Sequence, residues 1–473
     1  MNLPIQLRAI HWLLSIFLAS VFIPVAFGRQ SANPDREFQD AVAQYNAGRF
    51  AEAAGRLEDL VRELPENFEV HELLGLVYSA QSQDAKANAH LQEAVRLKPD
   101  SAAARSNLAA NLLRMGKPDA AGIELKKAVE LEPGNFDANH NLGELYVRAG
   151  KIAAAVPYLE HAQRINGDSY DNGYDLSLAY LLTERFSDAR RQVRILLDQK
   201  NTAELHNLLG QIEEKDGQFV AAVNEFETAA HMDSSESNLF DWGTELLLHR
   251  TLDAAVKVFQ EAVGRYPDST RLYVGLGMAL YSRGNYDDAV HALLKAADLN
   301  PSDPRCYYFL SKAYDSSPRQ ADEVIERFRR FADLQPENAR AVFYYAMSLW
   351  KGKRAEDGGL DFRNIETLLK RAVALDPNLA DAHLQLGNLA FDQKKYAESI
   401  PEYKRALHLS PAMADAHYRL GQAYVHTGEK DLARQELATY QRLRTRHLAE
   451  LDERRAEIRQ FVYSEKETQT AKP

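Results

Sequence analysis

A small residue recurs at a nearly constant interval along this chain, and this regularity limits the fold more than any other feature. The residue follows a leucine or an aromatic, as in Leu142-Gly143 and Leu276-Gly277. Between residues 75 and 421 the steps are 33 to 35 residues, with a single step of 41. Prolines follow the same interval at Pro65, Pro99, Pro133, Pro267, Pro301, Pro336, Pro377 and Pro411. A repeat of this length predicts a stack of similar structural units.

Each period is predicted to hold two helices. Leu142 and Leu145 fall at helical spacing, and Ala155 and Leu159 mark a second helix in the same period. We expect Gly143 on the first helix to face Ala155 on the second, so that the two helices approach closely. A large residue such as Leu159 then fills the gap between neighbouring units. The proline at the end of each period stops the second helix, because it cannot continue the hydrogen-bond ladder.

These residues resemble the tetratricopeptide repeat, with Asn139 in the slot of an aromatic. One unit is matched by Asn139, Leu142, Gly143, Tyr146, Ala155, Leu159 and Ala162, and another by Ala382, His383, Leu386, Gly387, Tyr403, Ala406 and Pro411. The resemblance covers nearly the whole chain after the N-terminal segment. It implies an all-α fold, an α-solenoid superhelix of about 12 helix hairpins over residues 34–447.

Three segments depart from the repeat pattern. Residues 352–359 form a longer loop that accounts for the step of 41, either a tolerated surface insertion or a contact loop. Residues 448–463 carry an apolar stripe, which predicts a capping helix over the last unit, with a short coiled-coil dimer and weak self-association as the alternative. Residues 464–473 are polar and are predicted to be a disordered tail.

The N-terminal segment is predicted to direct export. Residues 12–28 contain no charged side chain, and this length lies between a usual signal core and a bilayer-spanning helix. Residues 1–28 therefore form a cleaved signal peptide, an uncleaved membrane anchor or a buried helix, followed by a linker at residues 29–33. Either of the first two interpretations places the protein in the periplasm, outside the cell or tethered to the membrane.

The sequence offers no catalytic signature. Phosphate-binding loops, nucleophile elbows and zinc-helix motifs are absent from it. His206, His383 and His417 share one repeat position, and we interpret them as occupying a structural slot rather than binding a metal. Cys306 is expected to be a packed thiol. The formal net charge of −11 argues against nucleic acid as a partner. We therefore predict no catalytic residue, no metal and no cofactor.

The resemblance to tetratricopeptide repeats places the binding surface on repeat positions 2, 5, 9 and 12 of the first helices. The predicted peptide-binding groove consists of Phe240, Arg271, Tyr281, Arg305, Tyr308, Arg340, Phe343 and Trp350. Arg271, Arg305 and Arg340 share one repeat position and could each hold a carboxylate, so the expected partner is a polypeptide with acidic groups or a free C-terminal carboxylate. The alternative is that these arginines pair with neighbouring acids and the aromatics pack between units.

The sequence thus predicts an exported, non-catalytic scaffold for protein–protein interaction. One alternative is a membrane-anchored factor for the assembly or export of envelope proteins or polysaccharide. Another is a repeat arm that works with a separate enzyme of the glycosyltransferase type.

Overall fold

The computed structural model describes residues 33–316, 320–352, 361–446 and 449. In this part of the chain every regular element is a helix, which confirms the predicted all-α class. The predicted signal or anchor, the capping helix apart from residue 449, the tail and most of the 352–359 loop lie outside the described residues. Within the described ranges, none of the helices combines the length and apolar character needed to cross a bilayer.

The helices belong to two compact units that divide after Gly167. This glycine stands at the place in the period where Pro65, Pro99 and Pro133 stand in the preceding units. The first unit contains α1 (Asn33–Asn46), α2 (Phe50–Glu63), α3 (Phe68–Ala80), α4 (Asp84–Leu97), α5 (Ala102–Arg114), α6 (Pro118–Leu131), α7 (Phe136–Arg148) and α8 (Ile152–Ile165).

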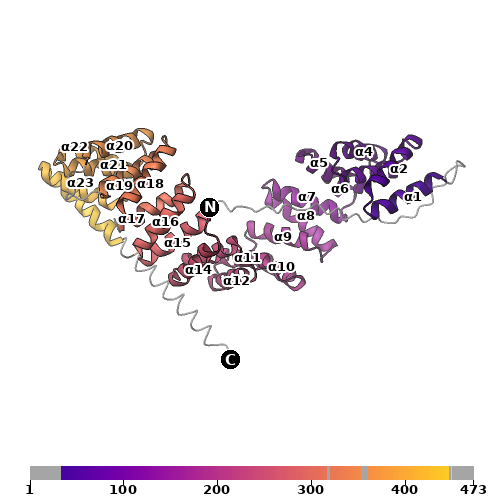
Figure 1. Cartoon of the computed structure of the whole chain (residues 1–473), viewed down its shortest axis with the longest axis horizontal. Helices are drawn as coiled ribbons and strands as arrows, with labels where there is room; N and C mark the ends of the chain where they lie inside the picture. The colour runs from indigo at the N-terminus through magenta and orange to yellow at the C-terminus, as the bar shows by residue number, and fades with distance from the viewer. Residues whose placement is uncertain (1–32, 317–319, 353–360, 447–448, 450–473) are drawn as a thin grey trace, which may run out of the picture. The chain divides into compact units, whose positions relative to one another are not determined.

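The second unit begins at Asp168 and is drawn from magenta to yellow in Figure 1. It contains α9 (Tyr170–Leu182), α10 (Phe186–Gln199), α11 (Ala203–Lys215), α12 (Phe219–Met232), α13 (Glu236–Leu248), α14 (Leu252–Arg265), α15 (Thr270–Arg283), α16 (Tyr286–Leu299), α17 (Pro304–Ser316), α18 (Ala321–Leu334), α19 (Ala339–Gly352), α20 (Phe362–Leu375), α21 (Ala380–Asp392), α22 (Tyr396–Leu409) and α23 (Ala414–Thr427). A further helix over residues 430–446 completes the last hairpin.

Within each unit the helices pair into hairpins that stack in chain order. In the first unit α3 packs on α4, and α4 packs on α5 of the next hairpin. In the second unit α15 packs on α16, and α16 packs on α17 in the same way. The core follows the stack as a succession of buried clusters, one of which extends from Ala230 on α12 to Ala341 on α19, because each hairpin buries its apolar face against its neighbours.

The small residue of the first helix allows a leucine of the same hairpin to pack directly over the backbone. A Cβ atom added at Gly143 would lie 2.6 Å from Cδ2 of Leu159. The atoms nearest to Gly143 therefore belong to Leu159 rather than to the expected Ala155. Leu159 lies one turn further along α8, and its longer side chain reaches back over the glycine, filling the interior of its own hairpin rather than only the gap between units.

Turn residues set the ends of the first helices. Asn67 and Ser101 each follow a proline by two residues, and their side-chain oxygens accept the backbone N–H of Val70 (2.9 Å) and Ala104 (3.2 Å). These N-caps satisfy amide groups that the helix itself leaves unpaired. The turn between α7 and α8 contains Gly150 with φ of 70°. Glycine adopts this left-handed backbone conformation at a lower cost in free energy than residues with a Cβ atom.

The first helices of the second unit line the inner side of its curve between α13 and α19. Here α13 contacts α15, α15 contacts α17 and α17 contacts α19, whereas among the described second helices of this stretch α16 and α18 alone make a comparable contact. Closer approach on the first-helix side means that the stack bends toward it. The exposed side chains of these first helices therefore lie on the side toward which the stack bends.

Candidate binding surface

The eight residues of the predicted groove all lie on first helices of the second unit. The structure places Phe240 on α13, Arg271 and Tyr281 on α15, Arg305 and Tyr308 on α17, and Arg340, Phe343 and Trp350 on α19. The three arginines are each the second residue of their helix. The three arginines therefore lie at equivalent places, near the start of three neighbouring first helices. The residues around each arginine differ.

Arg271 is already held by its own chain. Its Nε lies 3.1 Å from Oε1 of Glu236, and its guanidinium carbon lies 4.5 Å from the centre of the Phe240 ring. The hydroxyl of Ser269 donates to the same Glu236 oxygen at 2.8 Å. This side chain joins α13 to α15 through the ion pair and the ring contact.

Arg305 forms a two-pronged ion pair with Asp303, just before α17. Its Nε lies 3.0 Å from Oδ1 and its Nη2 lies 2.6 Å from Oδ2. These hydrogen bonds hold the pKa of the Asp303 carboxyl below its usual range, against the effect of burial. The carboxylate also accepts the backbone N–H of Arg305 at 2.9 Å, so the pair fixes the start of the helix.

Arg340 and Tyr308 are the open members of the predicted groove. Arg340 is exposed, its backbone N–H donates to Asn338, and its guanidinium makes no ion pair within the described residues. The Tyr308 side chain is 44% exposed. Both influence the pKa of Tyr344, which is raised mainly by burial; Arg340 lowers this pKa and Tyr308 raises it.

The other four aromatics serve mainly as packing. Phe240 and Tyr281 pack against the large core of the second unit, and Tyr281 also lies against Tyr286 with ring centres 5.5 Å apart. Phe343 and Trp350 are half-buried against the core formed by α19, α20 and α21. Most residues of the predicted groove thus follow the alternative interpretation, in which the arginines pair with neighbouring acids and the aromatics pack between units. Tyr308 and Arg340 are the two exceptions.

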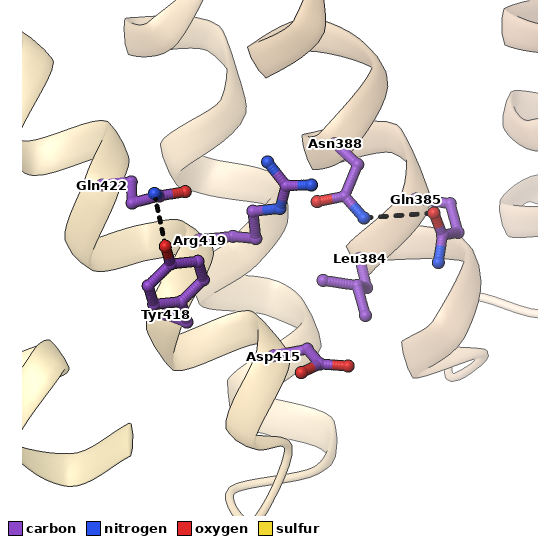
Figure 2. A pocket seen from close by; sticks show the side chains of 7 residues that line it. All are labelled: Leu384, Gln385, Asn388, Asp415, Tyr418, Arg419 and Gln422. Atoms are coloured by element: carbon purple, nitrogen blue, oxygen red, sulfur yellow. Dashed lines mark hydrogen bonds between the residues drawn. The ribbon is translucent and has the colours of Figure 1, made fainter. Parts of the chain in front are cut away.

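A hollow of about 460 Å³ lies further along the same row of first helices, between α21 and α23. Its lining residues are Leu384, Gln385, Asn388, Asp415, Tyr418, Arg419 and Gln422. Figure 2 shows Arg419 reaching from α23 toward Asn388 on α21, with Asp415 one turn earlier on α23 and Gln422 on the other side of Arg419.

The groove predicted from the sequence ends at Trp350 and therefore does not include this hollow. Repeat positions 2, 5 and 9, applied to α21 and α23, give six residues. All of them except Asp381 line the hollow, namely Leu384, Asn388, Asp415, Tyr418 and Gln422. The signal was therefore present in the register of the repeat. This signal is weak because the residues that line the hollow differ in type, whereas Arg271, Arg305 and Arg340 repeat one charged residue at one repeat position.

Two of the three histidines singled out by the sequence make a contact that recurs in other hairpins, whereas Nε2 of the third, His206, faces the side-chain oxygen of Asn201 at 2.8 Å. In both His383 and His417, Nε2 faces the carbonyl of a closing proline, Pro377 at 3.3 Å and Pro411 at 3.0 Å. Their Nδ1 atoms face glutamates on the second helix. The same carbonyl bond is made from the fourth position of other first helices by His71, Arg105, Asn139 and Tyr307. The slot is structural.

Carboxylates on the first-helix face are hydrogen-bonded across neighbouring hairpins. In the first unit Asn107 on α5 donates to Glu72 on α3 at 3.2 Å, and in the second unit Asn207 on α11 donates to Asp241 on α13 at 2.9 Å. Burial raises the pKa of both carboxyls, and the amide donors oppose that effect. These links tie successive first helices together on the face that a partner would approach.

Stacked helix hairpins with an open row of first helices define an α-solenoid repeat protein. Family models described as tetratricopeptide repeat match residues 38–102, 124–156, 146–212, 240–304 and 415–447, and one described as TPR repeat matches residues 387–428. Together the matched segments cover more than half of the chain. The chain belongs to the tetratricopeptide repeat family, and its repeats support a role as a protein-interaction scaffold.

Individual relatives are distant. A TPR repeat-containing protein, YpiA of Bacillus subtilis, is 24% identical over 231 residues, covering 45% of this chain and 51% of that protein. The human protein O-mannosyl-transferase TMTC3 is 25% identical over 149 residues, covering 31% of this chain and 16% of that protein. A structure of Naa15/Naa10 bound to HypK-THB has a TM-score of 0.38 and 16% identity, covering 86% of this chain and 68% of that one. The chain thus spans about half or less of the length of these two sequence relatives.

Proposed function

We propose that this protein is an exported, non-catalytic scaffold that binds an acidic polypeptide segment on the first-helix face of its second unit. The observation that carries the proposal is the pair formed by Tyr308 and Arg340. An exposed aromatic ring on α17 and a guanidinium without an ion pair in the described residues on the neighbouring first helix α19 both lie within electrostatic range of Tyr344. Such groups commonly dominate the free energy of protein–protein binding.

The acidic preference follows from the chemistry of Arg340. A guanidinium presents a planar fork of N–H donors that matches the two oxygens of a carboxylate. Tyr308 adds apolar contact area at a low cost in conformational entropy. Because Arg271 and Arg305 are already paired, we assign recognition to Arg340 and stabilisation of the helix row to the other two arginines.

Site-specific photo-crosslinking tests this proposal. A benzoylphenylalanine replacing Tyr308 should yield crosslinks to a partner polypeptide in the producing cell, whereas the same group at the exposed Lys295, on the second helix α16, should not. Arg340→Glu should abolish the crosslinks at position 308. Arg329→Glu, at an exposed arginine of the second helix α18, is the matched control and should leave them intact. Equal crosslinking at positions 308 and 295 would contradict the proposal.

Export is proposed from the uncharged stretch at residues 12–28. Fractionation of the producing cells should recover the protein outside the cytoplasm. N-terminal sequencing of the mature protein distinguishes a cleaved signal, with a new N-terminus near residue 29, from an intact anchor. An unprocessed protein confined to the cytoplasm would refute export.

The absence of catalysis is proposed because the sequence lacks catalytic motifs and the described residues form no metal-binding group. A second candidate function is a repeat arm that works with a separate glycosyl-transferring enzyme. The partial match to a protein named as an O-mannosyl-transferase favours it. In this case the polypeptide crosslinked at position 308 would belong to a glycosyl-transferring enzyme.

A further inference from the structure

The hollow between α21 and α23 holds two opposite charges that the described part of the chain does not pair. Asp415 and Arg419 lie one turn apart on α23 and both line the hollow, yet neither makes an ion pair there. Elsewhere the chain readily closes such i,i+4 pairs, as between Arg265 and Glu261 (3.0 Å). Neither side chain is therefore committed to an ion pair within the described residues. Asp415 also lines a second hollow, together with Arg444 and Arg446.

Arg419 is held so that its donors face the hollow. Its guanidinium carbon lies 5.5 Å from the centre of the Phe391 ring on α21. Stacking on an aromatic face leaves the N–H groups at the edge of the guanidinium free to bind a carboxylate. Figure 2 shows this group directed across the hollow toward Asn388.

Amide groups surround the two charges. Asn388 accepts a hydrogen bond from the buried Tyr403 hydroxyl at 2.9 Å and donates to Gln385 at 3.1 Å, which fixes its orientation. Gln422 donates to the Tyr418 hydroxyl at 2.9 Å. Side-chain amides offer both donors and acceptors, which is what the N–H and C=O groups of an extended backbone require.

The spacing of Asp415 and Arg419 along the axis of α23 is close to that of alternate residues in an extended polypeptide. Four residues of α-helix rise about 6 Å, and side chains two residues apart on one face of an extended strand are about 6.6 Å apart. We propose that this hollow binds an internal, extended polypeptide segment with an acidic and a basic residue two positions apart, the acidic residue on Arg419 and the basic residue on Asp415. The polar groups continue past Arg419 to Gln422, so the segment passes through rather than ending there.

This proposal does not depend on the Tyr308–Arg340 site. A random dodecapeptide display library, selected on the full chain, should enrich peptides in which Asp or Glu stands two positions from Lys or Arg. For an enriched peptide, made with blocked termini, Arg419→Gln should weaken binding about tenfold in fluorescence anisotropy. Replacing its acidic residue by Gln should have the same effect on the wild-type protein and no further effect on the Arg419→Gln variant.

Asp415→Asn should act in the same way on the basic residue of the peptide. The combined variant Asp415→Arg and Arg419→Asp should select peptides with the order of the two charges reversed. Arg329→Gln, at an exposed arginine of the second helix α18, serves as the control and should leave binding unchanged, while circular dichroism verifies that all variants fold. Failure to enrich any such peptide, or equal affinity for the wild type and the Arg419→Gln and Asp415→Asn variants, would overturn the proposal.

Discussion

His71 and His90 face each other across the hairpin of α3 and α4, with their Nδ1 atoms 3.0 Å apart. The Nε2 of His71 lies 3.1 Å from the Pro65 carbonyl, which can only accept a hydrogen bond. A neutral His71 therefore donates from Nε2 and accepts at Nδ1, and His90 is the donor. In the equivalent place of the hairpin formed by α21 and α22, Glu402 faces His383 at 2.7 Å.

This histidine pair predicts that the protein loses stability in mild acid. Burial, followed by the charge of His71, lowers the pKa of His90; Lys86 acts in the same direction, and Glu58 and Glu93 oppose it. The unfolded chain therefore binds more protons once the pH falls below the ordinary histidine value of about 6.5. This contribution to the free energy of unfolding is complete above that pH and is lost as the pH falls toward the lowered pKa of His90.

Urea titrations followed by circular dichroism between pH 7.5 and 5 should show this decline. His90→Gln can still donate to His71 but does not titrate, so the decline should become shallower. His161→Gln, at a histidine on α8 outside the pair, is the matched control and should keep the wild-type slope. An identical slope in His90→Gln and the wild type would contradict the prediction.

Gly277 is expected to tolerate no larger side chain. A Cβ atom there would lie 2.5 Å from Cγ of Leu293 on the facing helix, so Gly277→Ala should lower the free energy of unfolding by about 1–3 kcal/mol. Gly264 on α14 has open space at its Cβ position, and Gly264→Ala should raise that free energy by about 0.4–1 kcal/mol. Fluorescence of Trp242 and Trp350 during urea unfolding reports on this unit. Equal stability of the two variants would show that the close approach at Gly277 is not required.

The thiol of Cys306 should be inert in the folded protein. It is fully buried, its Sγ donates to the Asp303 carbonyl at 2.9 Å, and burial raises its pKa to about 12. Only the thiolate reacts appreciably with disulfide reagents. We expect no labelling by a chromogenic disulfide at pH 8 and one equivalent after addition of urea. Rapid stoichiometric labelling without denaturant would place the thiol at the surface.

Asp303 should contribute to stability rather than to binding. Asp303→Ala removes the acceptor for the backbone of Arg305 and the partner of its guanidinium, and we expect a loss of about 1–2 kcal/mol. Asp303→Asn keeps the backbone acceptor and should lose less. Because the carboxyl pKa is lowered in the fold, its ionic contribution is present above about pH 3.9 and is lost as the pH falls further. Wild-type stability of Asp303→Ala at neutral pH would refute this role.

The fold could be predicted from the sequence because each of its determinants is local and repeated. The small residue at Gly143 or Gly277, the leucine that packs over it and the closing proline recur in register, and one hairpin therefore predicts the next. The nearest neighbour of Gly143 is the side chain of Leu159, one turn beyond the expected Ala155. Side-chain reach around the helix decides that contact, and the period alone does not specify it.

The sequence predicts where the candidate binding surface lies, but not which of its side chains are already paired within the chain. Repeat register places Arg271, Arg305 and Arg340 at equivalent points, yet their availability depends on Glu236 and Asp303, whose pairing the register does not encode. The hollow at Arg419 was missed for a related reason. Asp415 and Arg419 stand four residues apart on α23 and yet form no ion pair with each other. The sequence does not show this, because it depends on the side-chain conformations.

The bond from the fourth residue of a first helix to the preceding proline carbonyl has an evolutionary consequence. Its donor and acceptor stand six residues apart, as His71 and Pro65 do, so a duplicated segment of one period carries the complete bond with it. Duplication or deletion of whole periods can therefore lengthen or shorten such an array without requiring a new hydrogen bond to evolve in each copy. Selection is then left to act on the few side chains that distinguish one copy from another.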